Sequence, residues 1–321
     1  MISRRGLGLS LLLSLGYGRA RAAPGDFKTW LDGVRREALS QGISRPTLNR
    51  ALAGVTLLPR VIELDRRQPE TTLTFAQYID RVVTPERRVE AREHLAQNRA
   101  LLDAVGARFG VAPRFIVALW GIETDFGHVV GNFPVIPALA TLAYDGRRAA
   151  FFRSELLNAL RIVDRQHIDP RRMLGSWAGA MGQSQFMPSS FLAYAVSYRG
   201  TGAPDIWNRR DDVFASIANY LSRAGWRRGE GWGDAVALPP GLAPSAETGA
   251  RPLGDWSAMG IRRVDGKPLA AEARKASLIL PAGPTGPGFL VYDNFRVLLK
   301  WNNSHYFAIA VGDLADSLAH P

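Results

Sequence analysis

The 321-residue sequence contains no cysteine. It therefore has no disulfide framework, no thiolate nucleophile and no cysteine-ligated metal site. It also has no cysteine to which a lipid could be attached. Its hydrophobic content of 46% and its 8 tryptophans still suffice for one large domain, or two modest ones, with a real core.

Long apolar runs are scarce, and the one near the N-terminus extends only from Gly6 to about Gly18. A bilayer-spanning helix needs about 20 residues, so we expect no membrane anchor here. Arg4 and Arg5 precede the run, and Ala20–Ala22 offers a small-x-small cleavage site. We predict that residues 1–22 are a cleavable export signal; the paired arginines are compatible with a twin-arginine signal as well as with an ordinary one.

Acidic residues are the scarcer charge, with 29 Asp and Glu against 40 Lys and Arg and a formal net charge of +11. Loss of the four arginines in residues 1–22 lowers this charge to +7. A basic chain favours an anionic partner, although a merely solvated basic surface gives the same composition. Because the arginines are scattered and an exported chain rarely meets nucleic acid, we expect an acidic cell-wall polymer rather than nucleic acid.

The apolar spacing predicts a mainly α fold. Trp30 to Leu39, Arg148 to Val163, Val213 to Ala224 and Tyr306 to Leu318 have helical periodicity. Helix boundaries are predicted at Ser44 and Pro46, at the Thr84 N-cap with Pro85 and Glu86, at Asp212 as a cap and at Gly225 as a stop.

Between Trp226 and Pro287 the composition shifts to Pro and Gly, with short β-like runs such as Ser277 to Leu280. Phe289 to Trp301 is also β-rich in composition. We predict five segments: the signal 1–22, an N-terminal helical segment 23–110, a helical catalytic core 111–225, a small α+β insertion 226–288 and a C-terminal return to the core 289–321.

A carboxylate lies on an apolar helical stripe in the middle of the chain. If Pro113 opens a helix to about Thr124, Ile116, Leu119, Trp120 and Glu123 share one face. A glutamate among apolar groups tends to keep its proton and can act as a general acid, for example on a glycosidic bond. A structural glutamate inside a helical core is the alternative at this point.

A second acid for a two-carboxylate glycosidase is not visible near Glu123. Asp125, two residues on, would point to the opposite side of the helix unless the helix has already ended, so we assign it a structural or helix-end role. One acid without a partner suggests that the substrate supplies the nucleophile, with the same glutamate acting first as acid and then as base. The C6 hydroxyl of N-acetylmuramic acid in peptidoglycan could do this by closing a 1,6-anhydro ring.

Several long motifs in order give the chain a resemblance to the membrane-bound lytic murein transglycosylase B family of bacterial cell-wall enzymes, whose catalytic domain is lysozyme-like and of the SLT type. The motifs lie at Val61–Glu70, Trp120–Thr124, Ala138–Arg148, Gly175–Phe191, Asp205–Trp207, Ser216–Leu221 and Trp301–Ser304. The resemblance spans nearly the whole mature chain. It implies a lysozyme-like helical fold and peptidoglycan glycan strands as substrate.

The resemblance also implies the site residues. Glu123 would be the catalytic acid/base, Ser176 and Asn302 polar groups near the reacting sugar, and Gln185 a substrate hydrogen-bonding residue. A cation-like sugar intermediate needs such oriented neutral dipoles. The structural alternatives are close backbone packing for the glycines of the Gly175 run, a helix cap for Ser176 and a turn for Asn302.

Aromatic residues near these motifs offer a wall on which a sugar could stack. The candidates are Trp120, Phe126, Trp207 and Trp301, and any of them could equally be an ordinary core aromatic. At least one of the four is expected to contact sugar.

The chain departs from the family in three places. Some members carry a calcium-binding loop before the Asp-Ile-Trp motif, but here Ser197–Asp205 lacks the early carboxylates and has Arg199 instead of an oxygen ligand, so we expect no metal. Phe307, beside Tyr306, stands where the family often has tyrosine, which puts a hydroxyl role there in doubt. The missing lipid-attachment cysteine predicts a soluble periplasmic enzyme.

The sequence thus predicts a lytic transglycosylase that cleaves the β-1,4 bond between N-acetylmuramic acid and N-acetylglucosamine without water and without a cofactor. A hydrolase of the same fold, in which water replaces the C6 hydroxyl, is one alternative. A non-catalytic peptidoglycan-binding protein is the other, although such a protein would not need Glu123.

Overall fold

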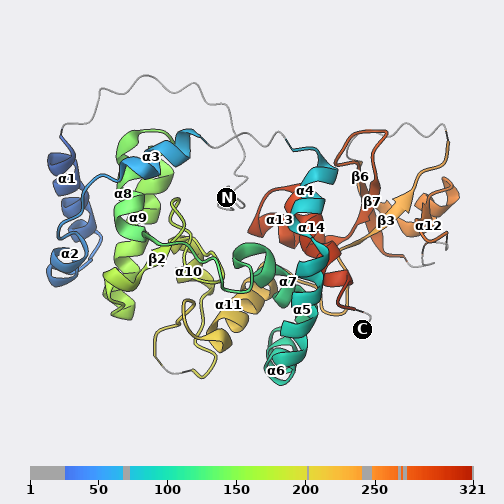
Figure 1. Cartoon of the computed structure of the whole chain (residues 1–321), viewed down its shortest axis with the longest axis horizontal. Coiled ribbons are helices and arrows are strands. Elements are labelled where there is room, and N and C mark those ends of the chain that lie inside the picture. Colours follow the sequence, from blue (N-terminus) through green and yellow to red (C-terminus); the bar gives the residue numbers. More distant parts are fainter. Residues whose placement is uncertain are drawn as a thin grey trace. The chain divides into compact units, whose positions relative to one another are not determined.

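The structure, a computed structural model, describes residues 26–67, 73–200, 202–240, 248–266, 269 and 273–319. The predicted export signal, residues 1–22, lies outside the described residues. The described part is mainly helical with a small sheet, as predicted (Figure 1). It divides into two compact units. Its described residues fall in unit 1 at 73–122 and 221–319, and in unit 2 at 26–67 and 123–220.

Unit 2 is built on two helices in contact, α8 and α9, which lie side by side in green in Figure 1. Its elements are α1 (Phe27–Ser40), α2 (Arg45–Ala51), α3 (Pro59–Arg66), β1 (Phe133–Pro134), α8 (Val135–Asp145), α9 (Ala149–Gln166), a 3-10 turn (Pro170–Arg172), β2 (Leu174–Gly175), α10 (Pro188–Tyr194) and α11 (Arg210–Arg223) up to Tyr220. Strands β1 and β2 pair antiparallel.

Helix α9 confirms the predicted apolar face. Phe152, Leu156, Leu160 and Val163, spaced by three or four residues, are all fully buried. Helix α8 is buried over most of its surface, which is typical of a central helix. The core of unit 2 therefore runs along these two helices.

The predicted helix starts at Ser44 and Thr84 are confirmed. The Ser44 side chain accepts a hydrogen bond from Thr47 N, with a proline in the first turn of α2. The Thr84 side chain accepts one from Arg87 N at the start of α5, and Pro85 and Glu86 follow.

Unit 1 combines helices with the small sheet. Its elements are α4 (Phe75–Val82), α5 (Pro85–Gln97), α6 (Arg99–Phe109), α7 (Pro113–Thr124) up to Ile122, β3 (Gly233–Ala237), β4 (Arg251–Pro252), α12 (Leu253–Ala258), β5 (Arg262–Arg263), β6 (Lys275–Ile279), β7 (Gly288–Val291), α13 (Asp293–Trp301) and α14 (His305–Asp316). All strand pairs are antiparallel, in the order β4-β6-β7-β3-β5.

The predicted α+β character of the insertion is confirmed by this sheet and by α12. Trp256 of α12 is buried in a cluster with Leu253, Ile261, Leu278 and Leu290, and its indole N–H donates to Ala276 O over 3.0 Å. The sheet thus has a core of its own, within unit 1.

The β-rich prediction for Phe289–Trp301 is wrong after the first three residues, because α13 occupies Asp293–Trp301. Phe295 and Leu298 are buried on one helical face, although valine, leucine and phenylalanine suit a strand equally well. Asn294 fixes the start of this helix: its amide donates to Arg227 O and Glu230 O, and its oxygen accepts from Arg227 N over 2.7 Å. Tertiary contacts decide the conformation here.

Helix α11 begins at Arg210, so the predicted cap role of Asp212 is wrong, since this residue lies in the first turn. Its end is as predicted. Gly225 has φ +103°, Trp226 N donates to Leu221 O and Gly225 N donates to Ser222 O, which is a Schellman arrangement.

In the described ranges, no single helix is both long and apolar enough to cross a membrane. Helices α6 and α7 reach that length and composition only as a pair, and they are bent by 109° at their break.

Candidate active site

Glu123 lies in the last turn of α7, and the helix has the predicted limits, Pro113 to Thr124. Ile116, Leu119 and Trp120 are fully buried, whereas Glu123 is half-buried. The glutamate therefore ends an apolar stripe at a point where its side chain still reaches solvent.

The chain turns sharply after α7. Asp125, Phe126 and Gly127 all have left-handed backbone conformations, with φ values of 53°, 55° and 88°. Two successive non-glycine residues in this region are uncommon and store strain, which is often found at functional sites. The helix has thus ended before Asp125, which fits the helix-end role predicted for it.

Thr124, the neighbour of Glu123, connects α7 to the glycine-rich run. Its hydroxyl donates to Gln183 O over 2.9 Å and accepts a hydrogen bond from Gly127 N over 3.2 Å. The side chain is almost fully buried. One threonine therefore fixes both the turn behind Glu123 and its position relative to the second motif.

The glycine-rich run forms two tight turns that precede α10. Ser176 N donates to Ala180 O, and the Ser176 hydroxyl accepts a hydrogen bond from Ala180 N over 3.1 Å. Met181 and Phe186 then pair with each other through both backbone groups, over 2.8 and 3.1 Å. Ser176 is thus not a helix cap; its hydroxyl holds a turn and keeps its own proton to donate.

Glycine is required in this run because backbone segments approach each other closely, which is the packing role considered for these glycines in the sequence analysis. A Cβ on Gly175 would lie 2.0 Å from Ala180 O, and one on Gly182 would lie 2.6 Å from Ile206 O. Gly182 also has φ +60°.

Gln185 lies at the tip of the second turn in a left-handed conformation, φ 49°. Its Nε2 donates to Val130 O over 3.1 Å and to Gly182 O over 2.9 Å. These two bonds fix the amide orientation, so its Oε1 is the atom that can accept a hydrogen bond from a ligand. Gln183, two residues earlier, is used structurally, since its Nε2 donates to Trp207 O and its N–H to Ile206 O.

Asn302 belongs to unit 1, where it follows α13 as the C-cap residue. Its Oδ1 is buried, and within the described ranges no donor bonds to it. An unsatisfied buried amide oxygen is costly and calls for an explanation such as a ligand. Glu123, Ser176 and Gln185 all belong to unit 2.

The four aromatic residues considered for sugar stacking differ in burial. Trp120 and Phe126 are core residues; the Trp120 ring contacts His94, with 4.9 Å between ring centroids. Trp207 and Trp301 are half-buried. The Trp207 indole N–H donates to Leu174 O over 2.7 Å, which fixes the ring and makes it the sugar-stacking candidate of unit 2.

Phe307 is buried in unit 1, and its neighbour Tyr306 is half-buried against the rings of Phe75 and Tyr78. Position 307 therefore supplies no hydroxyl group.

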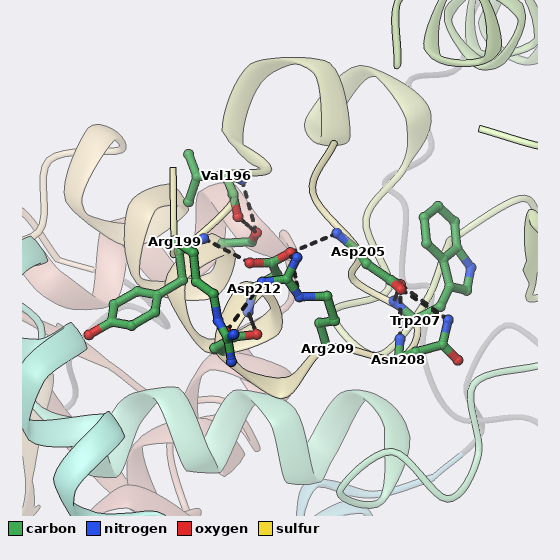
Figure 2. A network of polar contacts seen from close by, with 10 residues as sticks. Val196, Arg199, Asp205, Trp207, Asn208, Arg209 and Asp212 are labelled. Atoms are coloured by element: carbon green, nitrogen blue, oxygen red, sulfur yellow. Dashed lines mark hydrogen bonds and ion pairs between the residues drawn. The ribbon is translucent and has the colours of Figure 1, made fainter. Parts of the chain in front are cut away.

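Carboxylates and arginines hold the segment between α10 and α11, as Figure 2 shows. The buried Asp212 accepts hydrogen bonds from Tyr198 N over 2.7 Å and Asp205 N over 2.9 Å. Arg199, at a position where a calcium-binding loop would have an oxygen ligand, donates to Asp211 over 2.9 Å. In the part of the chain that the structure describes, no group of three or more His, Asp or Glu is arranged to hold a metal.

Asp211 forms ion pairs with both Arg199 and Arg209. Burial raises the pKa of its carboxyl, but hydrogen bonds from Arg199 and Arg209 outweigh burial, so the net pKa lies below its ordinary value. The segment that leads to Trp207 is thus fixed by the chain's own side chains.

Glu155 is a buried glutamate of unit 2 that the sequence analysis did not single out. It lies on α9 and accepts a hydrogen bond from Ser189 N over 2.9 Å, at the start of α10. Burial raises the pKa of its carboxyl, and the Ser189 hydrogen bonds offset part of that rise. Glu155 therefore anchors the helix that follows the glycine-rich run.

Known proteins resemble this chain over most of its length. The model of the transglycosylase SLT domain matches residues 26–316. The chain is 30% identical to membrane-bound lytic murein transglycosylase B of Escherichia coli K12 over 291 residues, which are 87% of this chain and 79% of that protein.

Two solved structures are also similar. SltB3 from Pseudomonas aeruginosa, in complex with NAG-anhNAM-pentapeptide, has 46% identity and a TM-score of 0.88, covering 92% of this chain and 80% of that one. The soluble lytic transglycosylase SltB1 from Pseudomonas aeruginosa has 30% identity and a TM-score of 0.79, covering 91% and 98%. The chain belongs to the SLT-domain family of lytic transglycosylases.

Proposed function

We propose that this enzyme cleaves the β-1,4 bond between N-acetylmuramic acid and N-acetylglucosamine in peptidoglycan, with Glu123 as its single acid/base. Glu123 protonates the leaving glycosidic oxygen. It then takes the proton from the C6 hydroxyl of the muramoyl residue, whose oxygen attacks the anomeric carbon and closes the 1,6-anhydro ring. No water is consumed, and Glu123 ends the cycle protonated as it began.

The position of Glu123 carries this proposal. It is half-buried at the end of an apolar helix, and its neighbour Thr124 is hydrogen-bonded to the run that contains Gln185. A half-buried carboxyl beside oriented dipoles is the arrangement that protonation of a glycosidic oxygen needs.

The buried carboxylates of unit 2 support a mechanism with one catalytic acid. Asp65 pairs with Arg148 over 2.6 Å, Glu155 accepts from Ser189 N and Asp212 accepts from two backbone N–H groups. Each of them has a structural task. A nucleophile from the substrate itself is therefore the simplest partner for Glu123.

The substrate-binding roles follow from the donors and acceptors left available. The Ser176 hydroxyl can donate, and Gln185 Oε1 can accept. Asn302 Oδ1, buried and unsatisfied in unit 1, can accept from an N-acetyl N–H or a sugar hydroxyl. A similar protein, SltB3, was crystallised with NAG-NAM-pentapeptide, so we include peptide-bearing glycan in the proposed substrate.

We also propose that residues 1–22 export the chain and are removed, and that the mature enzyme is soluble in the periplasm. The paired arginines and the apolar run support export, and the absence of cysteine argues against a lipid anchor. Cell fractionation with N-terminal sequencing tests this: a periplasmic protein that starts near Ala23 is expected, and a full-length cytoplasmic protein would contradict it.

The reaction is tested by the products of sacculus digestion. Purified sacculi incubated with the mature protein should release muropeptides with anhydro-muramoyl ends, which mass spectrometry separates from the hydrated form by the mass of one water. Reducing ends alone would identify a hydrolase. Binding without release would identify a non-catalytic peptidoglycan-binding protein.

A further inference from the structure

A cavity of about 390 Å³ lies between α1 and α9 in unit 2. Glu37 and Gln41 line it from α1, and a stripe of α9 residues at three- and four-residue spacing, from Ala150 to Arg161, lines it from the other side. None of the site residues described above takes part in it.

One of the two arginines in this cavity is neutralised within the protein. Arg153 pairs with Glu37 over 2.6 Å and lies over the Trp30 ring, 5.4 Å from its centroid. This pair fixes α1 on α9. It adds no net charge to the cavity.

The other arginine has only neutral partners. Arg161 donates to Asn158 Oδ1 over 2.7 Å and to Gln41 Oε1 over 2.9 Å, and it forms no ion pair with a carboxylate of the described residues. Its side chain is half-buried. A partly desolvated guanidinium without a counter-charge favours an anion from outside the protein.

The neutral groups around Arg161 restrict the kind of anion. Because Arg161 holds the oxygen of Asn158, the amide nitrogen of Asn158 is turned away from it and can donate to a ligand. Leu157 and Ala150 give the cavity an apolar wall. Glu37 makes a doubly charged phosphate unfavourable, whereas a single carboxylate beside a short aliphatic group is accommodated.

We propose that this cavity binds a carboxylate of the peptidoglycan stem peptide, held by Arg161 and Asn158, with an alanine methyl group against Leu157. The proposal rests on peptidoglycan being the substrate, as proposed above. It gives the enzyme a preference for glycan strands that still carry their peptides, through a site separate from the reacting sugar.

The test compares two substrates and two variants. The substrates are glycan strands with intact stem peptides and the same strands stripped of peptides by an amidase, with the lactoyl carboxylates that this exposes converted to amides. The variants of the mature protein are Arg161→Gln and, as the matched control, Arg165→Gln, which removes an exposed arginine one turn further along α9. Thermal unfolding of both variants verifies that they are folded.

We expect the wild type to have a KM about tenfold lower for peptide-bearing strands than for stripped strands. This ratio should fall to about one in Arg161→Gln and persist in Arg165→Gln. The proposal would be overturned if Arg161→Gln kept the tenfold difference in KM between the two substrates, or if Arg165→Gln lost it to the same extent. Equal KM values of the wild type for the two substrates would also overturn it.

A binding measurement separates this proposal from the proposed reaction. A free stem pentapeptide should bind the wild type about tenfold more tightly than it binds Arg161→Gln, and the same peptide with its carboxylates amidated should bind both equally weakly. Equal affinity of the unmodified peptide for both proteins would reject the cavity as its site. If neither kind of strand is cleaved, the proposed function fails while the binding result still decides the cavity.

Discussion

The hydroxyl of Thr124 donates a hydrogen bond to the backbone carbonyl of Gln183 across a separation of 59 residues in the chain. It joins the end of the helix that carries Glu123 to the run that carries Gln185. The geometry of the proposed site in unit 2 therefore depends on a residue that need not touch the substrate.

Replacement Thr124→Val keeps the shape of the side chain and removes this link. The Gln183 carbonyl would lose the hydroxyl that donates to it, which costs about 1–3 kcal/mol of unfolding free energy, and kcat should fall about tenfold or more because Glu123 and Gln185 lose their relative position. Denaturant unfolding and steady-state kinetics measure the two effects.

The matched control is Thr141→Val on α8. Thr141 is also buried, and its hydroxyl also has two backbone partners, Leu58 N and Pro137 O. We expect a similar loss of stability with an unchanged kcat. An equal fall of kcat in both variants would mean that Thr124 acts only through general stability.

A methyl group at Gly182 should disrupt the second turn of the glycine-rich run. Gly182→Ala places Cβ 2.6 Å from Ile206 O at a positive φ, so both stability and activity should fall. Gly202→Ala has a similar φ, +76°, but nothing within 4 Å of the new Cβ. It should cost only about 1 kcal/mol of conformational strain and leave the activity unchanged, as thermal unfolding and sacculus turnover can verify.

The stability of unit 2 should depend on pH through Glu155. Burial raises the pKa of this carboxyl in the folded state above its ordinary value of 4.5, so its favourable contribution is fully present below that value and is lost as pH rises through the folded pKa. Glu155→Gln keeps an acceptor for Ser189 N without the charge. The Tm of the variant relative to the wild type should therefore increase as pH rises above 4.5.

Asp164, also on α9, provides a control of opposite sign. A hydrogen bond from the Ser44 hydroxyl is the main cause that holds its pKa below the ordinary value of 3.8. Its contribution is present above that value and is lost as pH falls, so Asp164→Asn should lower Tm at neutral pH. A Tm difference for Glu155→Gln that does not change with pH would contradict the assignment.

Calcium should leave the stability unchanged, because Arg199 and Arg209 already engage the carboxylate of Asp211. After dialysis against a chelator, millimolar calcium should not shift Tm. A site filled at a hundred times its Kd would add about 2.7 kcal/mol, which is easily detected. A rise of several degrees would show that the segment between α10 and α11 binds the ion.

Local patterns were sufficient to predict several elements. The limits of α7, the buried face of α9 and the Gly225 stop of α11 depend on proline, apolar spacing and glycine conformation, which act within a few residues. The segment boundaries at 110, 225 and 288 remain predictions.

Long-range contacts explain what the sequence did not predict. Asn294 fixes α13 through backbone groups some sixty residues away, and Asp212 binds Tyr198 N and Asp205 N instead of capping its own helix. The Thr124–Gln183 and Glu155–Ser189 bonds were missed for the same reason. Their one local signal is a polar residue at an otherwise apolar position.

The role of Glu123 is tested most directly by comparing Glu123→Gln with Glu155→Gln on purified sacculi and measuring released anhydro-muropeptides by mass spectrometry. Loss of a general acid lowers the rate by about 10²- to 10⁴-fold, so Glu123→Gln should release almost none, whereas the wild type and Glu155→Gln should release them at similar rates. Release by Glu123→Gln at the wild-type rate would contradict the account.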